Sequence, residues 1–439
     1  MAHVLFMFLG AGRAPQSGAA TNAPTSSYSR TSYEFPSGQR RPASLFGLAL
    51  LDELAAAGDA ADKVVVLGTD GSAWDNLVTE TAGDVPGLGD LIARQGASAV
   101  TAGDLSGFAG PVQAAIADRS LTPTTVLEVI PYGFETAEQT ALIELLARHV
   151  GQGDRMSFDV SNGFRHFPML SVLAAIVVKR LRRAAIAGIW YGAFDHPRSR
   201  RDKVTPVVRL DGLAGIGDWL DVLAAFDADG NYGRFARLLK TDGAAPRDAE
   251  ALRVAGFREH VGNLGGAVEK LAAFNGAVDP DRLSAGARLF WPALAARTAW
   301  AASADPYQHF RSLALESLAA EDLVRTARLA HEAVLTRMAI HYCPPGQILD
   351  RDARGQARID FREAALRHSP AALQAFDELT QLRNVLVHGS YLVEQSECVR
   401  AALSDIAPCR RFLAERMATL LPEDPREPFQ PSGGGSAKH

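Results

Sequence analysis

Apolar residues follow different patterns in the two halves of the chain. Within residues 1–210, short β-branched or apolar runs repeatedly precede longer stretches in which apolar residues recur every three or four positions. This alternation is typical of parallel βαβ units. Strands are predicted at 4–9, 63–67, 124–130, 156–160 and 185–190, and helices at 45–57, 136–150 and 164–183. We therefore expect residues 1–210 to form a Rossmann-like α/β domain, with a parallel-type sheet and flanking helices.

After residue 209 the strand pattern disappears. Long segments rich in Ala, Leu and Arg alternate with Gly, Pro and Asp, as in a succession of helices. Helices are predicted at 216–228, 232–239, 249–274, 283–302, 306–341, 370–385 and 395–421, with a loop at 342–360. We expect an all-α second half, divided into a middle region at 211–304 and a C-terminal domain at 305–425, with a disordered tail at 426–439.

Composition limits the classes of function. The 439 residues are 47% hydrophobic, enough for more than one core, and 45 basic against 50 acidic residues give a net charge of −5. A globally cationic nucleic-acid coat is excluded, so any polyanion must bind regionally. Cys343, Cys398 and Cys409 are odd in number and lack metal-type spacing, which predicts no disulfide framework, no metal site and a reducing, cytoplasmic location. The longest apolar stretch, 173–178, is too short to span a membrane.

Small polar residues and glycines follow three of the predicted strands. In an open parallel sheet, ligands bind at the carboxyl ends of the strands, where backbone N–H groups attract anions. The candidate ligand-binding residues are Gly10, Gly12 and Arg30 after the first strand, Gly68, Thr69, Ser72 and Trp74 after the second, and Ser161, Asn162, Gly163 and Arg165 after the fourth. No complete dinucleotide fingerprint or P-loop is present. The alternative is that these are ordinary connections between strands and helices.

A local basic segment extends from Lys179 to Arg209. It contains nine Lys or Arg against Asp195 and Asp202, a balance of 9 − 2 = +7. Such a segment can hold a polyanion, or it can be a solvated helix end and loop.

The sharpest short motif is the run from Arg383 and Asn384 to His388, with the pattern R-N-x-x-x-H. Arginine and histidine together suit RNA cleavage by the 2′-hydroxyl, because imidazole can move a proton and guanidinium can stabilise the developing phosphorane, without a metal. On an ideal helix, a spacing of five places the side chains about 140° apart. Either the helix breaks near His388, where Gly389 follows, or a second subunit completes the site. The alternative is a surface arginine with a capping histidine.

These motifs resemble those of the type III CRISPR ancillary ribonucleases, in which an N-terminal CARF domain senses cyclic oligoadenylate and a C-terminal HEPN domain cleaves RNA. Residues 4–12 resemble the family's first strand and loop, 68–75 its Gly-Thr-x-x-Ser-x-Trp-Asp element, and 130–133 its Pro-x-Gly turn. Residues 159–165, Asp-Val-Ser-Asn-Gly-Phe-Arg, are similar to its Asp-x-Thr-His-Gly-Phe-Arg signature, and 383–388 fall where HEPN nucleases carry R-x4-6-H.

The resemblance implies a catalytic pair, Arg383 and His388, supported by Asn384, with no catalytic cofactor. It also implies a homodimer or a higher even-numbered homo-oligomer activated by cyclic oligoadenylate, with cyclic tetra-adenylate as the expected ring, and cleavage of single-stranded RNA to 2′,3′-cyclic phosphate ends. Ser161 and Asn162 replace the family's Thr and His, so the ring size and any ability to cleave the ligand are open.

Three other functions are considered. One is a catalytically silent cyclic oligoadenylate sensor that recruits another macromolecule, and the second is a ring nuclease that degrades the cyclic oligoadenylate. The third, a nucleotide-dependent α/β enzyme, is disfavoured because no cofactor fingerprint and no clustered acid/base set are present.

Overall fold

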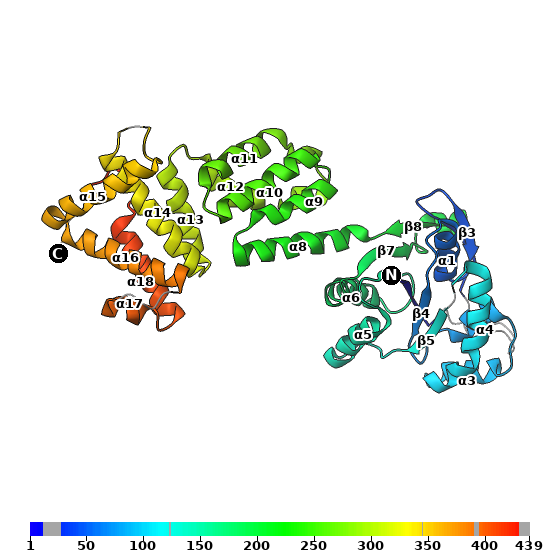
Figure 1. Ribbon diagram of the computed structural model, residues 1–439. Helices are drawn as coiled ribbons and strands as arrows, with labels where there is room; N and C mark the ends of the chain where they lie inside the picture. Colours follow the sequence, from blue (N-terminus) through cyan, green and yellow to red (C-terminus); the bar gives the residue numbers. More distant parts are fainter. Residues whose placement is uncertain (12–27, 123, 345, 390–394, 430–439) are drawn as a thin grey trace, which may run out of the picture. The chain divides into compact units, whose positions relative to one another are not determined.

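The computed structural model describes residues 1–11, 28–122, 124–344, 346–389 and 395–429. The chain divides into two compact units, Met1–Gly217 and Asp218–His439. The boundary falls inside helix α8 (Asp211–Asp229), near the expected start of the middle region (Figure 1). The expected α/β character of the first half and helical character of the second are both confirmed.

An eight-stranded sheet forms the centre of the N-terminal unit, in the order β3-β2-β8-β7-β6-β1-β4-β5. The strands are β1 (His3–Phe8), β2 (Thr31–Glu34), β3 (Arg40–Ala43), β4 (Lys63–Gly68), β5 (Thr124–Val129), β6 (Arg155–Asp159), β7 (Ala185–Gly192) and β8 (Val204–Arg209). The five predicted strands are present as the parallel set β7-β6-β1-β4-β5. The sequence did not predict β2, β3 and β8, which extend the sheet beyond β7 and include two antiparallel pairings.

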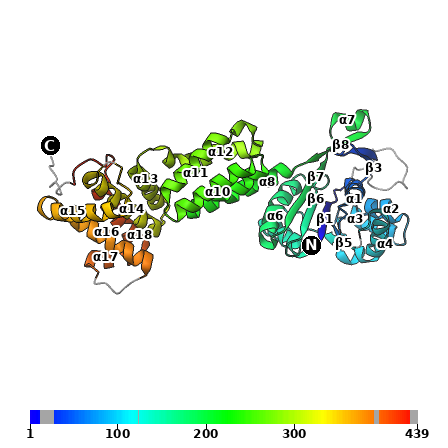
Figure 2. The ribbon, with the colours of Figure 1, turned by 45° about the horizontal axis from the view of Figure 1, so that its top comes forward.

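Helices cover both faces of this sheet. They are α1 (Phe46–Ala56), α2 (Trp74–Ala82), α3 (Leu88–Gly96), α4 (Ala102–Ser120), α5 (Thr136–His149), α6 (Phe167–Arg182) and the short α7 (Pro197–Arg201). Leu5 and Met7 of β1 pack in a core with α1, α2 and α4, whereas Val4 and Phe6 pack in a second core with α5 and α6. Successive side chains of a strand point to opposite faces, so one apolar strand supplies both cores. Figure 2 shows α1 and α4 on one side of the sheet and α6 on the other.

The strand order creates a reversal point beside β1. From β1 the sheet grows through β4 to β5 in one direction, and through β6 to β7 in the other. In open α/β sheets, such a reversal leaves a crevice at the carboxyl ends of the two flanking strands. The ends of β1 and β6 therefore define the favoured ligand position in this unit.

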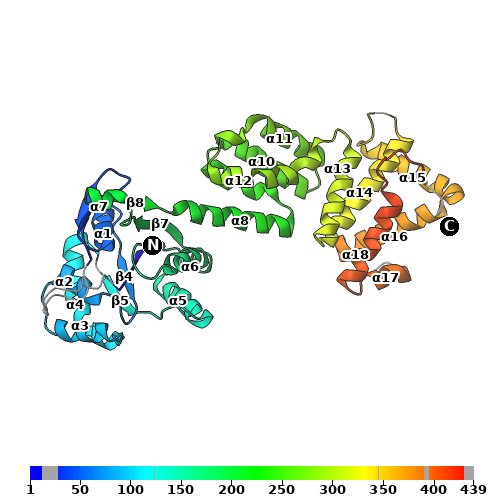
Figure 3. The same cartoon turned by 180° about the vertical axis from the view of Figure 1, so that it is seen from behind.

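The C-terminal unit is helical throughout its described residues. After α8, its elements are η1 (Tyr232–Arg234), α9 (Phe235–Thr241), α10 (Pro246–His260), α11 (Leu264–Ala277), η2 (Pro280–Arg282), α12 (Ala285–Thr298), η3 (Ala299–Ala302), α13 (Pro306–Ala319), α14 (Leu323–Tyr342), α15 (Arg351–His368), α16 (Pro370–His388), α17 (Glu397–Ala402) and α18 (Ile406–Leu420). Helix α14 contacts α13, α15, α16 and α18 and forms the middle of this bundle (Figure 3). None of the described helices is long and apolar enough to cross a membrane.

Three segments that the sequence predicts as single helices, 249–274, 306–341 and 395–421, each contain two helices in the structure. The break between α10 and α11 contains Gly262, whose φ of 86° suits glycine, and Asn263 caps α11. Asp322 caps α14 after a left-handed Glu321, and Asp405 caps α18. The predicted loop at 342–360 was wrong in its second half, because α15 begins at Arg351 behind the Asp350 cap.

The segment that follows α18 packs against the helices as far as residue 429. Arg337 is only 1% exposed, and its guanidinium donates hydrogen bonds of 2.7 Å to the carbonyl oxygens of Leu420 and Glu427. The same guanidinium lies 3.8 Å from the ring centre of Phe429. The expectation of a disordered tail from 426 was therefore wrong for 426–429, and residues 430–439 lie outside the described part of the chain.

Candidate functional site

A pocket of about 280 Å³ lies at the carboxyl ends of β1 and β6. Gly10, Ser161, Asn162 and Gly163, four of the predicted ligand-binding residues, line it. Tyrosines that the sequence analysis missed also line it, namely Tyr28, Tyr33 and Tyr191. The signal that could have found them is their position, because Tyr191 lies at the end of β7 and Tyr28 and Tyr33 lie before and within β2, which runs opposite to β1 and begins at this edge of the sheet.

Gly10 and Gly163 pack against each other in this pocket. A Cβ atom on Gly10 would lie 2.9 Å from the backbone nitrogen of Gly163, closer than such atoms approach in proteins. Gly163 itself has a φ of 98°, a backbone conformation that favours glycine. The hydroxyl of Tyr28 accepts a hydrogen bond from the Gly10 N–H at 2.8 Å and donates one to the Gly10 carbonyl oxygen at 2.9 Å. Glycine at both positions is thus required by the way the two loops meet.

Asp159, at the end of β6, lies under the Ser161 turn. Its Oδ1 atom accepts the backbone N–H of Ser161 at 2.8 Å, while Oδ2 is buried and has no partner among the described residues. The Ser161 hydroxyl oxygen accepts the N–H of Gly192 at 2.7 Å. Burial raises the pKa of Asp159 to about 7. Asp159 and the Ser161 hydroxyl therefore shape the turn, whereas the Asn162 side chain lines the pocket and has no hydrogen-bonding partner among the described residues.

The predicted ligand residues after β4 have a different role. Thr69, Ser72 and Trp74 are almost fully buried and do not line the pocket. The Ser72 hydroxyl accepts the Thr69 N–H and donates to the carbonyl oxygen of Leu9, and the Trp74 indole donates to the Thr69 carbonyl oxygen. Gly68 leaves room for the Trp74 ring. The interpretation of these four residues as ligand contacts is corrected, because their polar groups bind within the protein and fix the turn.

The remaining candidate ligand-binding residues of the N-terminal unit lie either at the surface or outside the described residues. Arg30 and Arg165 are exposed, and neither lines the pocket. Gly12 lies outside the described residues. Exposed Phe164 and Phe134 pack with each other, with ring centres 6.1 Å apart, beside the pocket loop.

At least four of the nine basic residues in segment 179–209 have acidic partners, and one of these pairs is Arg200 with Asp195. Arg198 pairs with Glu34, Arg201 with Asp202, and Arg209 with Asp211. These pairs favour the interpretation of the segment as a solvated surface.

Arg383 and His388 meet at the carboxyl end of α16. The helix continues to His388 and stops there, because Gly389 adopts a φ of 62° and donates its N–H to the carbonyl oxygen of Val385. Nη1 of Arg383 lies 3.4 Å from Nε2 of His388 and 2.9 Å from Oδ1 of Asn384. The helix thus ends near His388, one of the two expected alternatives, and the long arginine side chain closes the remaining angle within one chain. All three predicted catalytic residues are in contact.

The surroundings of Arg383 are buried and positively charged. Arg383 is half-buried, and its Nε atom has no hydrogen-bonding partner among the described residues. Beside it, His331 of α14 stacks on Phe376 with ring centres 5.5 Å apart. Within the described part of the chain, neither ring nitrogen of His331 has a hydrogen-bonding partner. Burial, and then the charges of Arg383, Arg358 and Arg354, lower the pKa of His331 to about 4. His331 is therefore a neutral side chain in a field of guanidinium groups, and sequence analysis gave no signal for it.

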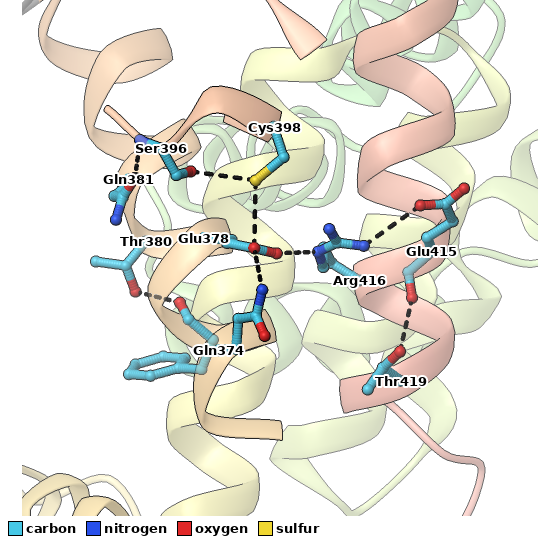
Figure 4. Close-up of polar contacts among 10 residues, drawn as sticks. Gln374, Glu378, Thr380, Gln381, Ser396, Cys398, Glu415, Arg416 and Thr419 are labelled. Atoms are coloured by element: carbon cyan, nitrogen blue, oxygen red, sulfur yellow. Dashed lines mark hydrogen bonds and ion pairs between the residues drawn. The ribbon is translucent and has the colours of Figure 1, made fainter. Parts of the chain in front are cut away.

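A polar network fixes the helix that carries the pair (Figure 4). Glu378 of α16 accepts hydrogen bonds from Gln374 at 2.9 Å, from the Cys398 thiol of α17 at 3.2 Å and from the Arg416 guanidinium of α18 at 2.6 Å. Burial alone would raise the pKa of Glu378, but these hydrogen bonds outweigh it and lower that pKa. Three helices are tied together shortly before Arg383. Among the described residues, no three His, Cys, Asp or Glu side chains are grouped as metal ligands.

Comparison with known proteins gives one informative match. No protein-family model matches the chain. Over 198 residues, the chain is 25% identical to the CRISPR-associated protein MJ1674 of Methanocaldococcus jannaschii. The match covers 41% of this chain and 31% of that relative's length. The match connects part of the chain with a CRISPR-associated protein.

Proposed function

We propose that this protein is a cyclic oligoadenylate-activated ribonuclease of type III CRISPR antiviral defence. The α/β unit is the CARF sensor, and residues 305–425 are the HEPN endoribonuclease, which cleaves single-stranded RNA without a metal. The observation that carries the proposal is the contact between Arg383 and His388 at the end of a helix in an all-helical unit. The partial sequence similarity to a CRISPR-associated protein supports the same assignment.

The chemistry requires only these side chains and the RNA. Nε2 of His388 takes the proton of a ribose 2′-hydroxyl, whose oxygen then attacks the adjacent phosphorus. The Arg383 guanidinium stabilises the negative charge that builds on the phosphorane oxygens. The bond from phosphorus to the 5′-oxygen breaks, that oxygen takes a proton from water, and the His388 imidazolium returns its proton to the solvent. The products are a 2′,3′-cyclic phosphate and a 5′-hydroxyl.

The pocket at the ends of β1 and β6 is the proposed activator site. Glycine backbones allow close approach of a phosphate, and Asn162 offers an amide. A cyclic oligoadenylate with two-fold symmetry, most simply cyclic tetra-adenylate, suits a homodimer in which each subunit supplies the same pocket. Exposed apolar side chains of the N-terminal unit, Phe134, Met169 and Leu173, support a dimer surface. The three cysteines are free, which suits the cytoplasm.

A cleavage assay tests this proposal. Fluorescent single-stranded RNA is incubated with the protein alone and with cyclic tri-, tetra- or hexa-adenylate. Cleavage that depends on one ring size and leaves 2′,3′-cyclic phosphate ends is the expected result. Ligand binding without RNA cleavage at any ring size would indicate a silent sensor, and loss of labelled ring would indicate a ring nuclease.

A further inference from the structure

A second cavity in the C-terminal unit borders Arg383. Its volume is about 470 Å³, and α11, α13, α14, α15 and α16 all contribute to its lining. The charged side chains on its wall are Arg328, Glu332, Arg354 and Arg383. Neither the sequence motifs nor the Arg383–His388 pair accounts for this cavity.

The positive charge on this wall is only partly neutralised. Glu332 pairs with Arg354 at 2.9 Å. Arg328 is half-buried and forms no hydrogen bond or ion pair with another described residue, although the carboxylates of Asp322, Glu259 and Glu332 lie near enough to favour its charged form. Since three arginines face one glutamate, the cavity has a net positive lining of 3 − 1 = +2. A guanidinium that is partly removed from water without an acidic partner is favourable when an anionic ligand supplies that partner.

Two neighbouring features also indicate a positive electrostatic potential around the cavity. The pKa of His331 is lowered by burial and then by Arg383, Arg358 and Arg354, so three guanidinium groups act together on this part of the bundle. The N-cap Asn263 and the first turn of α11, including Gly265, also line the cavity, and the first N–H groups of a helix carry partial positive charge. The cavity therefore favours an anion.

The position of Arg383 indicates which anion. Arg383 lines the cavity and also contacts His388, so a ligand in the cavity lies next to the cleavage chemistry. The volume lies in the range of pockets that hold small organic groups, about 300–1,000 Å³. A ligand that places one anionic group in the cavity and another at the Arg383–His388 pair needs successive phosphates, as a nucleic-acid strand has.

We propose that Arg328 and Arg354 bind a phosphate of the RNA backbone adjacent to the phosphate that Arg383 and His388 cleave. This inference rests on the proposed ribonuclease function. Arg328 is a positioning residue, because it acts on RNA affinity and register and does not contact the reacting atoms. A second contact to phosphate restrains the flexible strand. The phosphate to be cleaved is then held in position at Arg383 and His388 with a smaller loss of entropy.

The test compares Arg328→Gln with matched variants in a His388→Ala background that cannot cleave. Binding of a labelled single-stranded RNA is measured by fluorescence anisotropy at several salt concentrations. Arg328→Gln removes the charge and keeps a shorter, polar hydrogen-bonding side chain. We expect about a 10-fold loss of affinity, and a salt dependence reduced by about 0.7 in the slope of log K against log salt. Arg328→Lys should restore most of the affinity, because it restores the charge.

Arg367→Gln is the control, because Arg367 is an exposed arginine of α15 that does not line the cavity. It should bind RNA as the parent does. If Arg328→Gln binds with unchanged affinity and salt slope, the inference is overturned. Inorganic phosphate is also added as a competitor of the labelled RNA. If Arg328→Gln lowers the affinity for inorganic phosphate but not the affinity for RNA, the cavity binds free phosphate and the assignment to RNA is wrong.

The two proposals fail separately. If the wild-type protein never cleaves RNA but Arg328→Gln still weakens RNA binding, the nuclease assignment fails and the phosphate site stands. If the wild-type protein cleaves RNA and Arg328→Gln changes neither affinity nor KM, the nuclease assignment stands and the phosphate site fails.

Discussion

Nη1 of Arg383 lies 3.4 Å from Nε2 of His388, so the imidazole nitrogen that would receive the proton of the 2′-hydroxyl already faces a hydrogen-bond donor. One lone pair cannot accept from a guanidinium and take a proton from a substrate hydroxyl at the same time. In the tautomer that leaves Nε2 unprotonated, the proposed cleavage therefore requires the guanidinium to turn from His388 toward the phosphate. Breaking the contact between Arg383 and His388 is therefore a step that an activating ligand can control.

The first prediction concerns the meeting of the two glycines in the N-terminal pocket. Gly10→Ala places a methyl group 2.9 Å from the Gly163 nitrogen, and the neighbouring backbone must move. We expect a loss of about 1–3 kcal/mol in the free energy of unfolding and weaker binding of cyclic tetra-adenylate. Urea unfolding and calorimetric titration measure the two effects.

Gly89→Ala is the control for that substitution. Gly89 lies in α3, and no atom comes within 4 Å of a Cβ placed there. The variant should be neutral or more stable by up to about 1 kcal/mol, because alanine favours a helix. Equal effects at Gly10 and Gly89 would contradict the proposed packing role of Gly10.

The second prediction concerns Asp159. Its pKa is raised from 3.8 to about 7 in the folded protein, so the native state holds a proton that the unfolded state releases. The contribution of this group to stability is complete below about pH 4 and is lost as the pH rises through 7, at a cost of about 4 kcal/mol. Asp159→Asn should therefore become more stable than wild type as the pH rises from 5 to 8. Hydrogen exchange in β6 measures this difference, and a pH-independent difference would contradict the assignment.

The third prediction concerns His331, whose contribution to stability depends on pH in the opposite direction to that of Asp159. Its pKa is lowered from 6.5 to about 4 in the folded protein, so the unfolded state binds the proton more readily. The contribution of His331 to stability is complete above pH 6.5 and is lost as the pH falls toward 4, by about 3 kcal/mol. His331→Leu should remove this part of the acid sensitivity. Urea unfolding at pH 7 and pH 4.5 gives the comparison, and an equal pH slope in both proteins would show that His331 does not titrate this way.

The parallel strands could be predicted because they are buried on both faces. Every residue of β1 is buried, which produces an uninterrupted apolar run. By contrast, β8 contains Pro206 and exposed positions, and it lies in a basic segment that hides its pattern. Helix α15 buries only Ala357, Phe361 and Ala365, a stripe too thin to reveal a helix among charged residues.

The site was predictable in composition but only partly in geometry. Ser72 and Asn162 both follow strands in glycine-containing turns, yet one side chain turns inward to the Leu9 carbonyl and the other lines the pocket. Residue type and spacing do not encode that choice, which depends on how neighbouring loops pack. Likewise, the cavity beside Arg383 joins residues such as Gly265 and Arg354 that lie far apart in the sequence.

The fourth prediction concerns metal dependence. Arg383 and His388 together supply the positive charge and the proton acceptor that this cleavage requires. EDTA should therefore leave the ligand-stimulated cleavage rate unchanged within about two-fold, a margin small beside the 10²-fold or larger effect of one acid–base group. A rate that falls to background and returns with Mg²⁺ would point to another chemistry.

The most direct test of the account is the cleavage rate of His388→Ala at saturating cyclic tetra-adenylate. Removing the proton acceptor should lower the single-turnover rate by about 10²-fold or more, while the affinity for the activator stays at the wild-type value. The proposed activator pocket lies in the N-terminal unit and His388 in the C-terminal unit, so binding and cleavage are separable readouts. Cleavage by His388→Ala at the wild-type rate would contradict the assignment of Arg383 and His388 as the catalytic pair.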